Sequence, residues 1–130
     1  MTSDFITEAT DSTWEKLVEK ADLPVVVMFY LPGCSHCKAM EPFFAEYAQE
    51  FHETIQFVLL NAATFGWIAQ RYGIQSTPTF KFFCHGKPIR DMIGAAYPTL
   101  LRQAIEETLI YGEACHDSTS TIDYEISGYA

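Results

Sequence analysis

The chain has 130 residues, nearly half of them hydrophobic, which is enough for a single domain with a core that needs no metal or disulfide staples. Eight lysines and arginines stand against seventeen aspartates and glutamates, which gives a formal net charge of −9. A chain of this charge is repelled by phosphate backbones and anionic lipid, so we expect neither nucleic acid nor a membrane surface as a partner.

Hydrophobic periodicity predicts alternating strands and helices along most of the chain. The predicted strands cover residues 4–7, 25–31, 55–60, 79–83 and 88–93. The predicted helices cover residues 12–21, 35–51, 65–72 and 98–111. Strands joined through helices are expected to pair in parallel, and the last two strands are close enough to form a hairpin. The order therefore predicts an α/β fold with a mixed central sheet and helices on both faces.

Particular residues mark the ends of these elements. Ser12 and Glu15 have the spacing of a capping box that opens the first helix. Gly73 is expected to close the third helix in the left-handed conformation, and Pro98 to open the last helix in its first turn. Gly112 is expected to end that last helix.

Cys34-Ser35-His36-Cys37 lies where an apolar strand passes into a helix, which is the setting of thiol–disulfide exchange. Residues three apart share one face of a helix, so the two thiols are close enough to form a disulfide. Cys34 lies at the helix start, where free N–H groups and the helix dipole stabilise a thiolate, and it is the candidate nucleophile. Cys37, one turn later, is expected to be more buried and to resolve the mixed disulfide.

Four motifs carry a resemblance to the thioredoxin family over about residues 4–111. They are Cys34-x-x-Cys37 followed by Lys38 and Pro42, Tyr72-Gly73-Ile74 ahead of Thr77-Pro78-Thr79, the hairpin turn with Phe83 and Gly86, and Ile93-Gly94-Ala95. The resemblance implies the thioredoxin fold, a three-layer α/β/α arrangement with a sheet of about five strands and four helices. It also implies a cis bond before Pro78 and a substrate groove bordered by Gly33, Thr77, Pro78, Gly94 and Ala95.

The activity implied by the resemblance is that of a protein-disulfide oxidoreductase that forms a redox-active Cys34–Cys37 disulfide. Such a protein needs no bound cofactor and no metal, and it acts as a monomer on disulfide-containing proteins. Its own disulfide is reduced back to the dithiol by an enzyme like thioredoxin reductase.

Four residues at the site depart from the family pattern. Gly33 replaces the usual tryptophan, and Met28 and Leu59 replace a buried aspartate and the lysine that accompanies it. His36 stands before the second cysteine, where its charge and N–H stabilise the Cys34 thiolate. We therefore expect a weaker reductant than a thioredoxin with Gly-Pro between its cysteines. Without an aspartate at position 28, either His36 or water must accept the Cys37 proton, or the second step of the exchange is slower.

Two other functions remain open from the sequence. The histidine before the second cysteine is also typical of disulfide oxidases and isomerases. A second alternative is a thioredoxin-fold binding module or redox sensor that has lost turnover.

The start of the chain is acidic and lacks the basic and apolar segments of a signal peptide. This favours a cytoplasmic location, unless a signal peptide has been removed. In that compartment the two cysteines outside the motif, Cys84 and Cys115, are expected to be unpaired. Each is followed by a histidine, so a zinc site or a regulatory disulfide between them stays open.

We divide the chain into a domain at 1–112 and an acidic tail at 113–130, which is either disordered or an added strand or lid.

Overall fold

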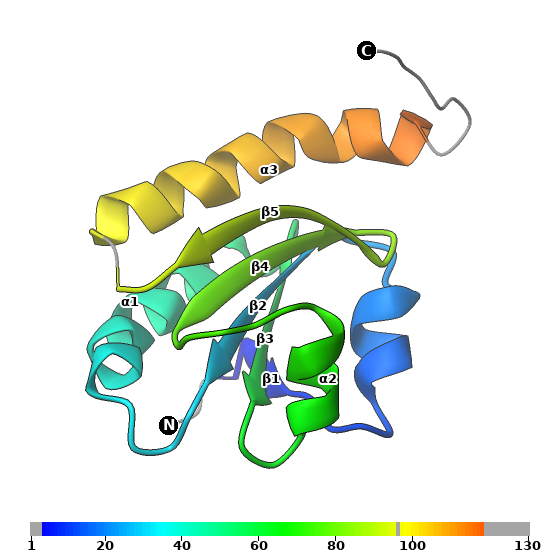
Figure 1. Cartoon of the computed structure of the whole chain (residues 1–130). Helices are drawn as coiled ribbons and strands as arrows, with labels where there is room; N and C mark the ends of the chain where they lie inside the picture. Colours follow the sequence, from blue (N-terminus) through cyan, green and yellow to red (C-terminus); the bar gives the residue numbers. More distant parts are fainter. Residues whose placement is uncertain (1–3, 96, 119–130) are drawn as a thin grey trace.

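The structure is a computed structural model that describes residues 4–95 and 97–118 (Figure 1). Its elements, in chain order, are β1 (Ile6–Glu8), the π-helical turn η1 (Glu15–Glu19), β2 (Val25–Tyr30), α1 (Ser35–Phe51), β3 (Gln56–Asn61), α2 (Gly66–Arg71), β4 (Thr79–Cys84), β5 (Lys87–Ile93) and α3 (Pro98–Ser118). Within the described residues, no helix is long and apolar enough to cross a membrane.

The strands form one five-stranded mixed sheet in the order β1-β3-β2-β4-β5. β3 pairs in parallel with both β1 and β2, whereas β4 pairs antiparallel with β2 and β5. Helices α1 and α3 cover one face of the sheet, and α2 with η1 covers the other (Figure 1). The predicted three-layer α/β/α architecture is confirmed.

Alternation along β2 explains why this strand is apolar throughout. Val26 and Met28 face the core beneath α1 and α3, whereas Val25, Val27 and Phe29 face the core beneath η1 and α2. Because successive side chains of a strand point to opposite faces, a central strand covered on both sides must be hydrophobic at every position. β2 is therefore held rigidly, and its carboxyl end fixes where the next segment begins.

The antiparallel pairing of β4 with β2 corrects the expectation that strands joined through helices pair in parallel. The helix between β3 and β4 has only six residues, and helix rise is about 1.5 Å per residue against about 3.3 Å in a strand. Such a helix is too short to carry the chain back along β3. β4 therefore begins at the same end of the strands where β3 finishes, and it runs antiparallel to β3.

Two predicted element ends were wrong. The first helix has no capping box, because the Oγ1 of Thr13 accepts a hydrogen bond from the Thr10 N–H at 2.8 Å and Glu15 pairs with Lys20 at 2.9 Å. The last helix continues through Gly112 to Ser118. Glycine weakens a helix interior by only about 1 kcal/mol relative to alanine, so it does not have to end one. The rest of the predicted tail, 119–130, lies outside the described residues.

Candidate active site

Cys34 and Cys37 lie at the start of α1, directly after the loop that leaves β2. Cys34 is the N-cap residue, with an extended backbone held by a hydrogen bond from its N–H to the Leu31 carbonyl at 3.1 Å. The two cysteines form a disulfide with their Cα atoms 5.2 Å apart. Cys34 is partly exposed, whereas Cys37 is only 1% exposed. A partner can therefore reach Cys34 far more easily than Cys37, as the sequence predicted.

The sulfur of Cys34 takes the place of a capping side chain. The N–H of Cys37 donates a hydrogen bond to it at 3.1 Å. The first N–H groups of a helix have no partner within the helix, and a negative charge is favoured there. When the disulfide is reduced, the same position stabilises a Cys34 thiolate.

Of the predicted groove residues, Thr77 contacts Cys34, and Pro78 and Gly94 adjoin Thr77. The Thr77 carbonyl oxygen lies 3.6 Å from the Cys34 sulfur, and the Thr77–Pro78 bond is cis, as expected. The N–H of Gly94 donates to the Pro78 carbonyl at 2.7 Å, and Gly94 has a φ of +87°, a conformation that favours glycine. Ala95 follows on the surface.

Gly33 and His36 lie on the solvent side of the motif. Both are exposed, and a Cβ placed on Gly33 would meet nothing within 4 Å. The groove beside Cys34 is therefore open at the position where a tryptophan side chain would cover it.

Two core positions behind the motif are apolar. Met28 and Leu59 are Cα partners across β2 and β3, and both are buried in the core beneath α1. Neither side chain can accept a proton.

The family model described as Thioredoxin matches residues 5–107, a span that holds the whole sheet and the cysteine motif. The chain belongs to the thioredoxin family. It is 41% identical over 99 residues to Thioredoxin M-type, chloroplastic, of Brassica napus, covering 76% of this chain and 56% of that protein. It is 35% identical over 102 residues to Thioredoxin 1 of a Nostoc species, covering 78% and 95%. Thioredoxin Y, chloroplastic, of Oryza sativa is 37% identical over 100 residues, covering 77% and 60%.

The chain thus spans 56% to 60% of these two chloroplastic relatives but nearly all of the Nostoc thioredoxin. The matched region in each case is about the length of the thioredoxin domain described above.

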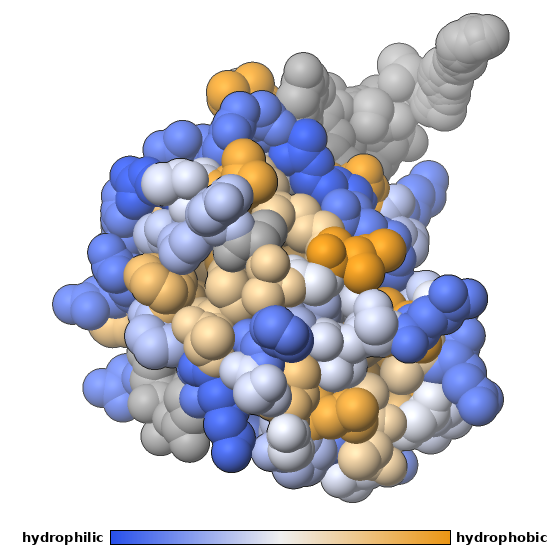
Figure 2. Space-filling model, turned by 60° about the vertical axis from the view of Figure 1, so that its left-hand side comes forward, coloured by the Kyte–Doolittle hydropathy of each residue, from blue (hydrophilic) through white to orange (hydrophobic). Residues whose placement is uncertain are grey.

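Apolar side chains of α2 and of the segment between β2 and Cys34 reach the surface of this thioredoxin domain. Trp67 is 52% exposed and Leu31 41% exposed, whereas Tyr30 and Phe65 are half-buried. A shallow hollow of about 260 Å³ lies between Leu31, α2 and Thr77. The face turned forward in Figure 2 shows apolar and weakly polar surface bordered by charged residues. This arrangement offers apolar contact beside the reactive sulfur.

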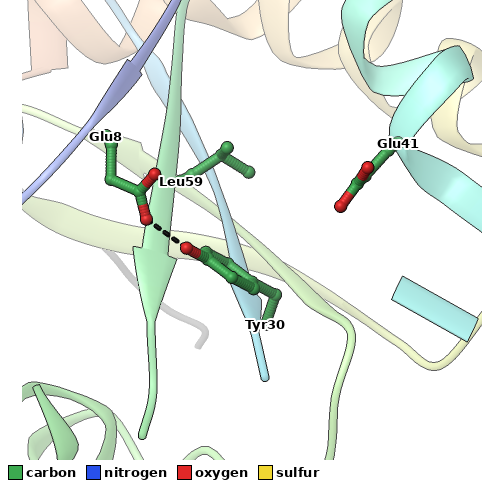
Figure 3. A pocket seen from close by; sticks show the side chains of 4 residues that line it. All are labelled: Glu8, Tyr30, Glu41 and Leu59. Atoms are coloured by element: carbon green, nitrogen blue, oxygen red, sulfur yellow. Dashed lines mark hydrogen bonds between the residues drawn. The ribbon is translucent and has the colours of Figure 1, made fainter. Parts of the chain in front are cut away.

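Sequence reasoning missed a polar pair next to the motif. The Tyr30 hydroxyl donates a hydrogen bond to Oε2 of Glu8, across β3 (Figure 3). Burial, followed by the hydrogen bond and charge of Glu8, raises the pKa of Tyr30 well above its ordinary value. The phenol therefore keeps its proton over the whole physiological range. Only the register of β1 on β3 reveals this pair, and no sequence motif encodes that register.

The remaining cysteines are only partly described. Cys84 is buried at the end of β4, and none of the described cysteines is a free thiol, which corrects the expectation of an unpaired Cys84. No cluster of metal-ligating residues occurs in the part of the chain that the structure describes. The side chains of Cys115 and His116, on which the zinc and disulfide alternatives depend, lie outside it.

Proposed function

We propose that this chain is a thiol–disulfide oxidoreductase that reduces protein disulfides through Cys34 and Cys37. The single observation that carries the proposal is the disulfide between a partly exposed N-cap cysteine and a buried cysteine one turn later. Membership of the thioredoxin family supports it.

In the proposed reaction, the Cys34 thiolate attacks one sulfur of a substrate disulfide, and the substrate's other sulfur leaves as a thiolate. The Cys37 thiolate then attacks the Cys34 sulfur, and the second substrate thiolate leaves. Two electrons pass to the substrate, and the protein is left with its own disulfide. A reductase of the thioredoxin-reductase class returns the dithiol.

The roles of the other residues follow from their positions. The Thr77 backbone, 3.6 Å from the Cys34 sulfur, and the neighbouring Pro78, Gly94 and Ala95 form the surface against which an extended substrate segment lies. Gly33 leaves room for bulky substrate side chains beside Cys34. His36 stabilises the reduced form and makes the protein a weaker reductant than a Gly-Pro thioredoxin.

The reduction of insulin by dithiothreitol tests the proposal. The wild-type chain should accelerate insulin precipitation, and Cys34→Ser should abolish the acceleration. Cys37→Ser should form stable mixed disulfides through Cys34, which can be isolated and identified. A protein that binds partners equally well with and without Cys34 and gives no turnover would instead be a binding module.

A second function, disulfide oxidation or isomerisation, is favoured by His36. It predicts that the oxidised chain restores activity to a reduced, unfolded disulfide protein faster than it reduces insulin. The cytoplasmic location and the monomeric state stay predictions, which fractionation of the source cells and light scattering would test.

A further inference from the structure

A small cavity lies between the sheet and α1, at the helical turn that follows Cys37. Its volume is about 110 Å³, enough for several water molecules, and its lining residues are Glu8, Tyr30, Glu41 and Leu59 (Figure 3). These residues come from β1, β2, α1 and β3 respectively, so four elements meet around it. The two carboxylates and the phenol give water in this cavity polar partners.

Glu41 is the cavity residue nearest to Cys37 along the helix. The two are four residues apart on α1, so their side chains share one face of the helix and their Cβ atoms are about 5–6 Å apart. Side chains on a helix lean toward its N-terminus, which carries the Glu41 side chain back toward the turn of Cys37. Cys37 is buried and Glu41 half-buried, so solvent reaches Cys37 less directly than it reaches Glu41.

We propose that Glu41 accepts, through water in this cavity, the proton that Cys37 loses when it attacks the mixed disulfide. The inference rests on the proposed function, because it assigns a residue to the second step of that exchange. The Cys37 thiol passes its proton to a bridging water, and that water passes a proton to the Glu41 carboxylate. The Cys37 thiolate then forms the bond to the Cys34 sulfur, the bond from Cys34 to the substrate breaks, and the substrate thiolate takes the electron pair. Glu41 afterwards returns its proton to solvent.

Other groups near Cys37 are less suited to this role. Glu8 already accepts the Tyr30 hydrogen bond, and the raised pKa of Tyr30 keeps that phenol protonated. His36 is exposed, and as the residue before Cys37 it points about 100° away around the helix. The interior pair Met28 and Leu59 carries no acceptor.

The charged groups around Glu41 are few. Glu8 and Tyr30 face it across the cavity, from β1 and β2, while β3 contributes Leu59. Lys38 lies one turn earlier on the same helix. Among the described residues, Glu41 makes no hydrogen bond or ion pair that would occupy its oxygens.

The reaction of the reduced protein with 5,5′-dithiobis(2-nitrobenzoate) separates the two steps. Release of the first thionitrobenzoate reports attack by Cys34, and release of the second reports attack by Cys37 on the mixed disulfide. Glu41→Gln should leave the first release unchanged and slow the second by about 10–100-fold. This is at or below the lower end of the usual effect of general-base catalysis, because water relays the proton. A Cys34→Ser protein measures the background from the other cysteines.

The pH dependence distinguishes a proton acceptor from a structural role. In the wild-type protein, the second release should rise at acid pH as the carboxylate ionises and then level off. In Glu41→Gln it should instead keep rising with pH toward alkaline conditions. Glu41→Asp should restore part of the rate, and Glu46→Gln, which removes the same charge from an exposed site on α1, should have no effect.

An unchanged second release in Glu41→Gln, or a slowing with the wild-type pH profile, would overturn the inference. A wild-type protein that shows no second release at all would overturn the proposed function instead. A loss of rate in Glu8→Gln that equals the loss in Glu41→Gln would also count against Glu41 as the specific acceptor.

Discussion

The sulfur of Cys34 lies 3.1 Å from the backbone nitrogen of Cys37, whose N–H donates to it. This contact does not depend on any neighbouring side chain, because the helix itself supplies the donor. Replacing residues between the cysteines will therefore change the stability of the thiolate without removing this contact. Two predictions separate the contribution of the backbone from that of His36.

The first concerns the reactivity of the reduced site. At pH 6, Cys34 should react with iodoacetamide at least about tenfold faster than free cysteine, because the start of a helix stabilises the thiolate. The measurement uses Cys37→Ser, which keeps the backbone N–H and removes the second thiol. The same variant with His36→Ala should retain most of the enhancement. Alkylation at the rate of free cysteine would contradict the assignment of Cys34 as nucleophile.

The second concerns the redox potential. The wild-type Cys34–Cys37 couple should lie above about −270 mV, since His36 stabilises the dithiol form. His36→Pro should lower the potential by about 20–40 mV, which corresponds to roughly a tenfold change in the exchange equilibrium. Ser35→Gly serves as a control at the other intervening position. Equilibration with glutathione followed by alkylation gives both values, and a wild-type potential at or below about −270 mV would refute the prediction.

The third prediction concerns the β4–β5 turn. Gly86 has a φ of +81°, and a Cβ there would lie 2.6 Å from the Glu19 carbonyl oxygen. Gly86→Ala should therefore destabilise the fold by at least about 2 kcal/mol, from the left-handed backbone and the clash together. Gly73→Ala is the matched control, because its φ is +71° but nothing lies within 4 Å of the added carbon. It should cost about 1 kcal/mol in urea unfolding; equal losses would show that the contact with Glu19 is unimportant.

Much of the fold could be predicted from the sequence because the signals are local. The predicted helix at 35–51 has a clear apolar period and matches α1 residue for residue. The apolar run at 25–31 predicted a strand, which corresponds to β2. The direction of β4 was mispredicted because it depends on how far the short helix α2 carries the chain. Gly112 was mispredicted as a helix end because local propensity is weak compared with the rest of a 21-residue helix.

In the site, too, the local features could be predicted from the sequence and the long-range ones could not. The cysteine pair was identified from its spacing and from its place between a strand and a helix, both of which are local. The cavity was not, because Glu8 and Tyr30 are 22 residues apart in sequence and meet only through the register of three strands. Long-range register is set by the complete hydrophobic pattern of the sheet rather than by any motif.

The fourth prediction concerns a buried lysine in the sheet. Lys81 of β4 is buried, and its Nζ lies 2.7 Å from Oδ1 of Asp91 on β5. Asp91→Asn should destabilise the fold by about 1–3 kcal/mol, because it leaves the ammonium without a full counter-charge. Lys81→Met, which removes the buried charge and keeps the length of the side chain, should cost less. Urea unfolding of both variants checks the order, and a larger loss for Lys81→Met would contradict it.

The fifth prediction concerns pH and the ion pair between α1 and α3. A hydrogen bond from Arg102 lowers the pKa of the Glu50 carboxyl from its ordinary value of 4.5, with Nη2 and Oε2 2.6 Å apart. A carboxyl whose pKa is lower in the folded state stabilises the fold above the unfolded-state pKa and loses that contribution as pH falls through the folded-state value. Glu50→Gln should therefore be less stable than wild type at pH 7, and the difference should shrink as pH falls from about 4.5 and vanish once Glu50 is protonated. Glu53→Gln removes the same charge from an exposed residue just after α1 and is the control. Thermal unfolding across this pH range gives the test, and a difference between Glu50→Gln and wild type that does not change with pH would show that the pair with Arg102 contributes nothing through ionisation.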